Sequence, residues 1–297
     1  MPPSVSPLRE LMQVAGTLLV AAVGGIGFHL IGFPGGLVSG SMLTVAVAAL
    51  GGCAVKIPLP LARLGFVRVG SLRGAVVTPA TLKGIASWPL SVALLVVAAI
   101  CMMTATAWYL RLAHGWDPLS ALLGASPGSM AQVMALSAEF DADVRGIAIV
   151  HVMRVLLIVL GLPAGLALFG STVEPVVSTR GATDASLVEL AILVTVSSLS
   201  ALVMLRIRFP GGLMFGAMAG SGLLHGTDLI HISLPWWAGG AAVLTLGAVA
   251  GARFANTSPK ILLSYLAAAF GSFAVAVAVA ASFALVVVAL LRSGLPT

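Results

Sequence analysis

The chain has 297 residues, of which 60% are hydrophobic and only 8% are charged, and its mean hydropathy is +1.14. About 25% of the residues in a soluble globular domain are charged. This composition therefore excludes a soluble domain and predicts an all-α polytopic membrane protein. The net charge of +6 comes from basic residues that are scattered singly, which argues against direct binding of nucleic acid.

Nine apolar windows predict transmembrane helices, because each holds about the 20 apolar residues that a bilayer requires. They are 11–31, 36–55, 60–79, 86–110, 144–169, 187–207, 211–228, 236–254 and 261–291. The first window follows a single arginine and lacks a small-residue cleavage site, so we expect a retained span and not a removable signal peptide. Cys53 and Cys101 lie in apolar stretches, where we expect buried side chains and neither a disulfide nor a metal pair.

A further apolar piece, 119–138, is interrupted by Ser126-Pro127-Gly128. Each half is too short to cross a bilayer, so we predict a re-entrant hairpin that enters the membrane and returns. The alternative is a proline kink in a structural helix, since proline and glycine are frequent in membrane helices.

The distribution of basic residues favours the hairpin. With a cytoplasmic N-terminus and a returning hairpin, the residues on the inside are Arg9, Lys56, Arg63, Arg111, Arg145, Arg206, Arg208, Arg253 and Lys260, whereas Lys83, Arg180 and Arg292 are outside. A piece that crossed the bilayer would move the last five of the inside residues outside, against the positive-inside rule. The sequence therefore predicts a multi-pass protein of a bacterial-type cytoplasmic (inner) membrane with its N-terminus in the cytoplasm.

The sequence also repeats itself. The five residues Phe33-Pro34-Gly35-Gly36-Leu37 recur 176 positions later as Phe209-Pro210-Gly211-Gly212-Leu213. Further identities follow at nearly the same offset, and they pair Gly40 with Gly216, Met42 with Met218, Gly70 with Gly247, Gly74 with Gly251 and Lys83 with Lys260. The predicted topology has five crossings between the two copies, which places them on opposite faces of the membrane. This is an inverted repeat, the plan of many secondary transporters.

We expect a first repeat at 1–170, with five spans and the hairpin at 119–138, a linker loop at 171–186, and a second repeat at 187–297. In this register the counterpart of the hairpin would begin near Leu295. The second repeat is therefore expected to be truncated before its hairpin and the span after it.

The predicted hairpin offers a candidate substrate-binding site at Ser126, Pro127, Gly128, Ser129 and Met130. A half-helix that begins near Ser129 would present free backbone N–H groups and the positive end of its dipole to an anion or a polar group. The hydroxyls of Ser126 and Ser129 would add hydrogen-bonding groups.

Arg154 lies about ten residues into its predicted span, one helical turn after His151. A central arginine costs roughly 2.5 to 3.5 kcal/mol on insertion scales, so we expect it to have a role. It either braces the hairpin by donating to carbonyls near Gly128 or contacts a ligand directly. His151 alone is more typical of a packed polar residue. Arg68 lies centrally in the third predicted span and is a further candidate for the same cavity.

Metal and cofactor chemistry is not expected. His225, Asp228 and His231 lie three residues apart, but this spacing matches no established metal site. The remaining carboxylates lie in loops or near span ends, whereas cation exchangers coupled to protons or sodium need one near the membrane centre. The five scattered histidines also do not supply the converging ligands of a copper or iron oxygenase.

Three segments together resemble the AbrB-type membrane protein family, whose members carry a duplicated domain. They are the Phe-Pro-Gly-Gly-Leu opening of each repeat, the Ser126–Met130 segment, and Ala142-Asp143-Val144-Arg145 leading to His151-Val152-Met153-Arg154. Members of this family are labelled regulators of gene expression or ammonia monooxygenases. Ser129 stands where members usually have a second glycine.

Two hypotheses follow for the function. The first is a transporter-like carrier for a small anionic or polar solute that uses residues 126–130, His151, Arg154 and Arg68. The alternative is a membrane-embedded regulator or sensor that affects gene expression indirectly, because no soluble segment exceeds roughly 20 residues, far below the size of a DNA-binding domain. A metal-dependent monooxygenase is the least favoured function. We expect that the protein is not an enzyme and binds no cofactor. The expected partners are the lipid bilayer, the solute and a second copy in a homodimer.

Overall fold

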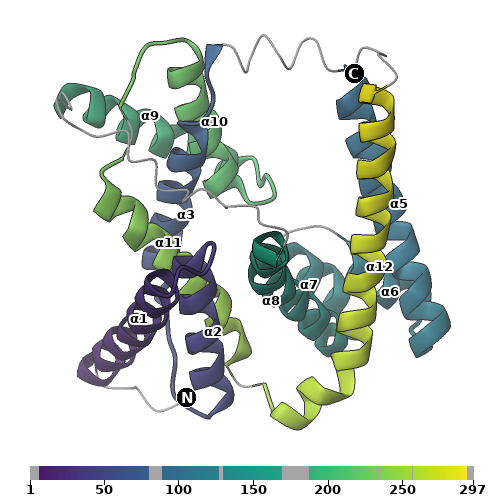
Figure 1. Cartoon of the computed structure of the whole chain (residues 1–297). Helices are drawn as coiled ribbons and strands as arrows, with labels where there is room; N and C mark the ends of the chain where they lie inside the picture. Colours follow the sequence, from purple (N-terminus) through teal and green to yellow (C-terminus); the bar gives the residue numbers. More distant parts are fainter. Residues whose placement is uncertain are drawn as a thin grey trace. The chain divides into compact units, whose positions relative to one another are not determined.

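The computed structural model describes residues 7–79, 89–126, 130–168, 187–232, 234–255 and 257–292, and every regular element in these ranges is helical (Figure 1). The helices are α1 (Pro7–Leu30), α2 (Gly36–Leu50), α3 (Leu59–Gly74), α5 (Pro89–His114), α6 (Pro118–Ala125), α7 (Met130–Glu139), α8 (Val144–Leu168), α9 (Leu187–Arg206), α10 (Gly212–Gly226), α11 (Trp236–Gly251), the 3-10 helix η1 (Ala252–Phe254) and α12 (Pro259–Arg292). The expectation of an all-α protein is confirmed.

Six stretches of described helix are long and apolar enough to cross a membrane. They are Leu8–Leu30, Ala93–His114, Val144–Gly165, Leu187–Arg206, Trp236–Phe254 and Pro259–Ala289. Large apolar side chains on them are exposed, for example Leu19 at 66%, Leu95 at 69% and Leu285 at 70%. Water would not favour so much exposed apolar surface, whereas lipid does. The class of polytopic membrane protein is therefore confirmed.

Three of the nine predicted spans contain shorter helices. α2 and α10 have 15 residues each and α3 has 16, which is about 22 to 24 Å at 1.5 Å per residue. The hydrocarbon core of a bilayer is about 30 Å thick. The number of nine spans therefore stays a prediction.

The chain divides into two compact units. Unit 1 consists of residues 1–79 and 158–258, and unit 2 consists of residues 80–157 and 259–297. Each unit combines residues from both predicted repeats, so repeats and compact units are different divisions of the chain. The repeat boundaries near residues 170 and 187 stay a prediction.

Unit 1 contains two sets of three helices that pack in a reciprocal way. In the first set α1 packs on α2, and in the second set α9 packs on α10. The third helices are exchanged, since α3 of the first set packs on α10 and α11 of the second set packs on α2. α3 and α11 also contact each other. A two-fold relation between the two sets would produce reciprocal contacts of this kind.

The Phe-Pro-Gly-Gly turns before α2 and α10 have the same backbone conformation. Gly35 has φ 65° and ψ 24°, and Gly211 has φ 66° and ψ 23°, so both lie in the left-handed region. The N–H of Phe33 donates to the carbonyl of Phe28 at 3.0 Å, and the N–H of Phe209 donates to the carbonyl of Met204 at 3.0 Å. The repeat in the sequence is thus also a repeat in backbone geometry.

Paired glycines allow the exchanged helices to approach closely. A Cβ placed on Gly70 of α3 would lie 2.8 Å from the Cβ of Ala217 on α10. A Cβ placed on Gly247 of α11 would lie 2.8 Å from the carbonyl oxygen of Val38 on α2. Gly70 and Gly247 are counterparts in the repeat, so the same close contact occurs twice.

Unit 2 contains α5 and α12, which pack side by side (Figure 1). α6 packs on α5 and on α7. A buried cluster of Leu123, Val133 and Ile147 joins α6, α7 and the start of α8. Residues 144–157 of α8 belong to this unit, and the rest of α8 belongs to unit 1.

Candidate functional site

Two short helices lie where the sequence predicts the hairpin. α6 has eight residues and α7 has ten, so they are about 12 and 15 Å long. Neither is long enough to cross a bilayer.

Hydrogen bonds join the start of α6 to the start of α8. The carboxylate of Asp117 caps α6 by accepting from the backbone N–H of Leu119 at 3.0 Å and of Ser120 at 2.9 Å. The backbone N–H of Asp143 donates to the hydroxyl of Ser120 at 2.8 Å. The chain therefore leaves this end of unit 2 at residue 117 and has returned to it by residue 143. A hairpin requires this path, and its entry into a bilayer stays a prediction.

Asp143 also caps α8 and contacts α12. Its Oδ1 accepts from the N–H of Gly146 at 3.0 Å, and its Oδ2 accepts from the hydroxyl of Tyr265 at 3.0 Å. The ring of Tyr265 lies edge-on to that of Trp116, with 6.1 Å between the centroids. Neither Asp117 nor Tyr265 was among the predicted site residues. A local signal existed for Asp117, which precedes a proline as helix-capping residues often do, but none exists for a tyrosine 122 positions from Asp143.

Hydrogen bonds from Ser120 favour the charged form of Asp117. The side chain of Ser120 makes the largest contribution and lowers the pKa of Asp117 from its ordinary value, and the backbone N–H of Ser120 lowers that pKa further. Slight burial of the carboxyl opposes this shift of the pKa. Asp117 is therefore a charged cap at neutral pH.

Arg154 of α8 lies at the other end of α6. Its Nη1 donates to the carbonyl of Ala125 at 3.1 Å, and its Nη2 donates to the carbonyl of Ser126 at 3.0 Å. These carbonyls belong to the last residue of α6 and to its C-cap, where unpaired carbonyls form the negative end of the helix. The guanidinium thus braces the end of α6, which is one of the two roles expected for it. Direct ligand contact stays a prediction.

The positive charge of Arg154 has no carboxylate partner among the residues that the structure describes. The ion pairs there are Lys56 with Glu10 at 2.8 Å and His231 with Asp228 at 3.0 Å. The side chain of Arg154 is half-buried, and carbonyl groups carry no net charge. A guanidinium has five N–H donors, so two carbonyl bonds leave donors and a full positive charge for an anion or a polar group.

The other predicted site residues that the structure describes in unit 2 are Ser126, Met130 and His151. The hydroxyl of Ser126 donates to the carbonyl of Leu123 at 3.1 Å. His151 is buried, with its Nδ1 3.2 Å from the carbonyl oxygen of Ile147. Met130 is the half-buried first residue of α7. Pro127, Gly128 and Ser129 lie outside the described residues.

Arg68 is half-buried on α3 and belongs to unit 1, whereas Arg154 belongs to unit 2. A cavity shared by the two arginines therefore stays a prediction. Arg63 and Arg73, on the same helix as Arg68, are exposed, as expected for side chains that extend toward polar surroundings.

His225 lies in the last turn of α10 and links that helix to the segment that follows it. The two ring nitrogens of His225 each lie 2.8 Å from a carbonyl oxygen, of Ser221 and of Ile232. In the described part of the chain, no three metal-ligating side chains converge. The two cysteines are free thiols, but Cys53 is exposed and Cys101 is half-buried. The expectation that both are buried is therefore wrong, because Cys53 follows the end of α2 at Leu50, and Cys101 lies on α5, where neighbours such as Ile100 are exposed.

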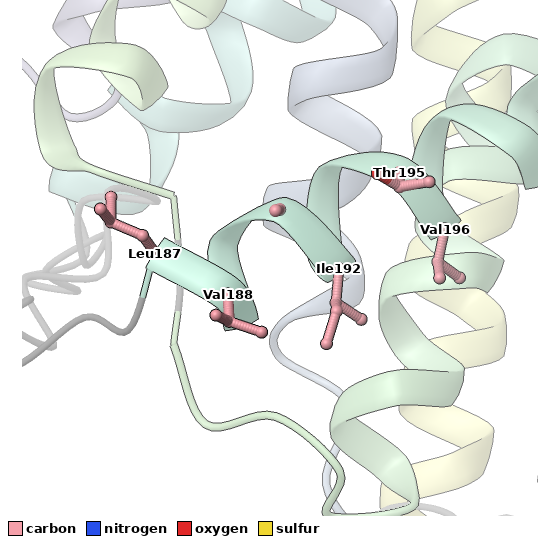
Figure 2. Close-up of a pocket in the computed structure, with 6 residues that line it drawn as sticks. Leu187, Val188, Ile192, Thr195 and Val196 are labelled. Carbon is pink, nitrogen blue, oxygen red and sulfur yellow. The ribbon is translucent and has the colours of Figure 1, made fainter.

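A shallow apolar groove lies along the first turns of α9 (Figure 2). It is lined by Leu187, Val188, Ala191, Ile192, Thr195 and Val196. None of the predicted site residues lines this groove, and its exposed apolar surface is typical of a helix that faces acyl chains.

The helices and the exposed apolar surface define an all-α polytopic membrane protein with a short helical pair braced by an arginine. The sequence matches the family described as "Transition state regulatory protein AbrB" over residues 37–296, and the chain belongs to this family. It is similar to the protein named "Putative regulator AbrB" of Escherichia coli (strain K12), with 25% identity over 261 residues, which cover 82% of this chain and 72% of that protein. No solved structure matches the chain.

Proposed function

We propose that the chain is a carrier for a small anionic or polar solute in a bacterial-type cytoplasmic membrane, with its N-terminus in the cytoplasm. One observation carries the proposal: the half-buried guanidinium of Arg154 bonds two carbonyls at the end of α6 and has no carboxylate partner in the described ranges. An arginine in a transmembrane segment is costly and usually marks a functional site. A negatively charged solute would supply the missing counter-charge.

Two features of the fold support a carrier. The reciprocal packing of α1–α3 and α9–α11 supports an inverted repeat, which is the plan of many secondary transporters. In those proteins, solutes bind near the ends of short helices that do not cross the membrane. The α6–α7 pair has this character, since both helices are short and the chain returns to its starting end.

The test is solute flux into proteoliposomes. We expect uptake of at least one small anion from a panel of radiolabelled acetate, malonate and phosphate, with urea as an uncharged polar probe. Arg154→Ala should reduce that uptake at least tenfold. Arg154→Lys should recover only part of it, because an ammonium cannot donate to two carbonyls with the planar geometry of a guanidinium.

The matched control is Arg63→Ala, which removes an exposed arginine and should leave flux unchanged. Equal flux by wild type and Arg154→Ala would remove Arg154 from the site. No flux of any probe, with the folded state preserved, would favour the second candidate.

The second candidate is a membrane-embedded regulator or sensor without transport, which acts on gene expression indirectly. The family description and the name of the Escherichia coli relative favour it. This candidate predicts a stable protein partner in membrane extracts and changed transcript levels on deletion. Specific binding of purified chain to operator DNA would contradict the indirect route. Neither candidate requires an enzymatic step or a cofactor, and in both we expect a homodimer in the bilayer.

A further inference from the structure

A buried serine of α2 bonds the backbone of α8. The hydroxyl of Ser39 donates to the carbonyl of Val159 at 2.8 Å, across 120 positions of the sequence. Ser39 is 1% exposed, and both residues belong to unit 1. Serines inside helices often bond a carbonyl of their own helix, as Ser41 does with the carbonyl of Leu37. The bond from Ser39 to another helix therefore calls for an explanation.

Pro163 of α8 provides that explanation. In an α-helix, the N–H of each residue donates to the carbonyl four positions earlier. The residue four positions after Val159 is Pro163, which lies inside the helix and has no N–H. The carbonyl of Val159 thus lacks its helical donor, and the hydroxyl of Ser39 takes the place of the missing N–H. Carbonyls freed by proline in membrane helices need such a replacement, because lipid offers no donor.

The repeat does not require a serine at this position. The counterpart of Ser39 in the second set is Phe215, which is 43% exposed. The turns before α2 and α10 are otherwise equivalent in backbone geometry. The serine at position 39 is therefore explained by its bond to α8, and the repeated fold does not require it.

We propose that Ser39 acts as a latch on a bend in α8. Proline weakens a helix at the turn that precedes it, so α8 can bend between Val159 and Pro163, and the bond from Ser39 holds the carbonyl of Val159 to α2. Arg154 lies five residues before Val159 in the sequence, but the latch does not depend on the proposed carrier function.

A double-mutant cycle tests the latch by equilibrium unfolding of the full chain in mixed micelles, without any solute. Ser39→Ala should raise the unfolding equilibrium constant roughly threefold to twentyfold, the range that corresponds to about 0.6 to 1.7 kcal/mol for a hydrogen bond between membrane helices. Pro163→Ala restores an N–H for the carbonyl of Val159. In that background Ser39→Ala should change the constant less than twofold. Ser39→Thr keeps a hydroxyl and adds a methyl at a buried site, so its effect on the constant should be the same with Pro163 and with Pro163→Ala.

Hydrogen exchange of residues 158–165 provides the local readout. Ser39→Ala should accelerate amide exchange there, the double variant should not, and the matched control Ser41→Ala should leave α8 unchanged. Equal effects of Ser39→Ala in both backgrounds, or unchanged exchange in α8, would overturn the latch. Because no solute enters these measurements, loss of the carrier proposal in the flux assay would leave their outcome intact.

Discussion

At the scale of single residues, charged side chains of unit 2 satisfy the ends of helices. Arg154 donates to the last carbonyls of α6, and Asp117 accepts from its first N–H groups. A helix end away from water must find such partners within the protein. A helix of only eight residues would be marginal by itself, so these partners help to explain why α6 forms.

Asp117 makes the stability of unit 2 depend on pH. Its pKa is lower in the folded chain than in the unfolded chain, where it is about 3.9. The charged cap therefore contributes its full stability above pH 3.9, and this contribution is lost as the pH falls through the lower folded pKa. Asp117→Asn keeps an oxygen acceptor but has no charge. We expect this variant to lack the part of the stability that the wild type loses at acidic pH.

The measurement is thermal unfolding in detergent between pH 7 and pH 2. At pH 7, Asp117→Ala should cost roughly 0.5 to 2 kcal/mol, the usual effect of removing an N-cap. The difference in stability between wild type and Asp117→Asn should become smaller below pH 4. A difference that persists unchanged at pH 2 would show that the charge of Asp117 has no part in the cap.

At the scale of elements, α2 and α10 begin with the same left-handed glycine. Left-handed backbone disfavours any residue with a Cβ. This explains why the third residue of Phe-Pro-Gly-Gly is glycine in both copies. The fourth residue is glycine for a different reason, since a Cβ on Gly36 or Gly212 would overlap the backbone of α1 or α9.

We expect Gly35→Ala to destabilise the chain by roughly 1 to 2 kcal/mol. Gly211→Ala should cost at least as much, because its Cβ would also lie 3.1 Å from the ring of Phe215. A Cβ at Gly35 would meet no atom closer than 4.0 Å, so its cost there is almost purely one of backbone conformation. The control is Gly16→Ala within α1, where nothing lies within 4 Å and alanine is the better helix former. Unfolding in mixed micelles measures all three, and a neutral Gly35→Ala would contradict the left-handed turn.

At the scale of the whole molecule, the exchanged helices α3 and α11 make each set of unit 1 depend on the other. The close contacts of Gly70 with α10 and of Gly247 with α2 are equivalent under the repeat. If one set folded alone, the side of α3 that carries Gly70 or the side of α11 that carries Gly247 would lack its partner helix. Unit 1 should therefore form only when both sets are present.

We expect Gly70→Ala and Gly247→Ala to be comparably destabilising, by about 1 to 3 kcal/mol each, the usual cost of overpacking a closely packed interface. The control is Gly240→Ala on α11, which would meet nothing within 4 Å. Equilibrium unfolding in mixed micelles again gives the comparison. If Gly247→Ala behaved like Gly240→Ala, the close packing of α11 on α2 would be refuted.

The amino-acid sequence alone determined the class of protein, the approximate places of its long apolar helices and the repeat at Phe33–Leu37 and Phe209–Leu213. These features follow from local composition and from identities along the chain, because a bilayer admits helices of apolar residues and few alternatives. The sequence also suggested the return of the chain near Pro127 and a bracing role for Arg154.

Only the tertiary structure decided which groups meet. It showed that α3 and α11 are exchanged between the sets, that Tyr265 reaches Asp143, and that Ser39 donates to Val159. Contacts between residues more than a hundred positions apart produce no periodic pattern in the sequence. A hydroxyl group or a glycine can pack against many different neighbours, and only the packing of the folded chain selects one. Pro163 and Ser39 are both plain in the sequence, but only the structure shows that the hydroxyl of Ser39 bonds the carbonyl of Val159, which Pro163 leaves without its helical donor.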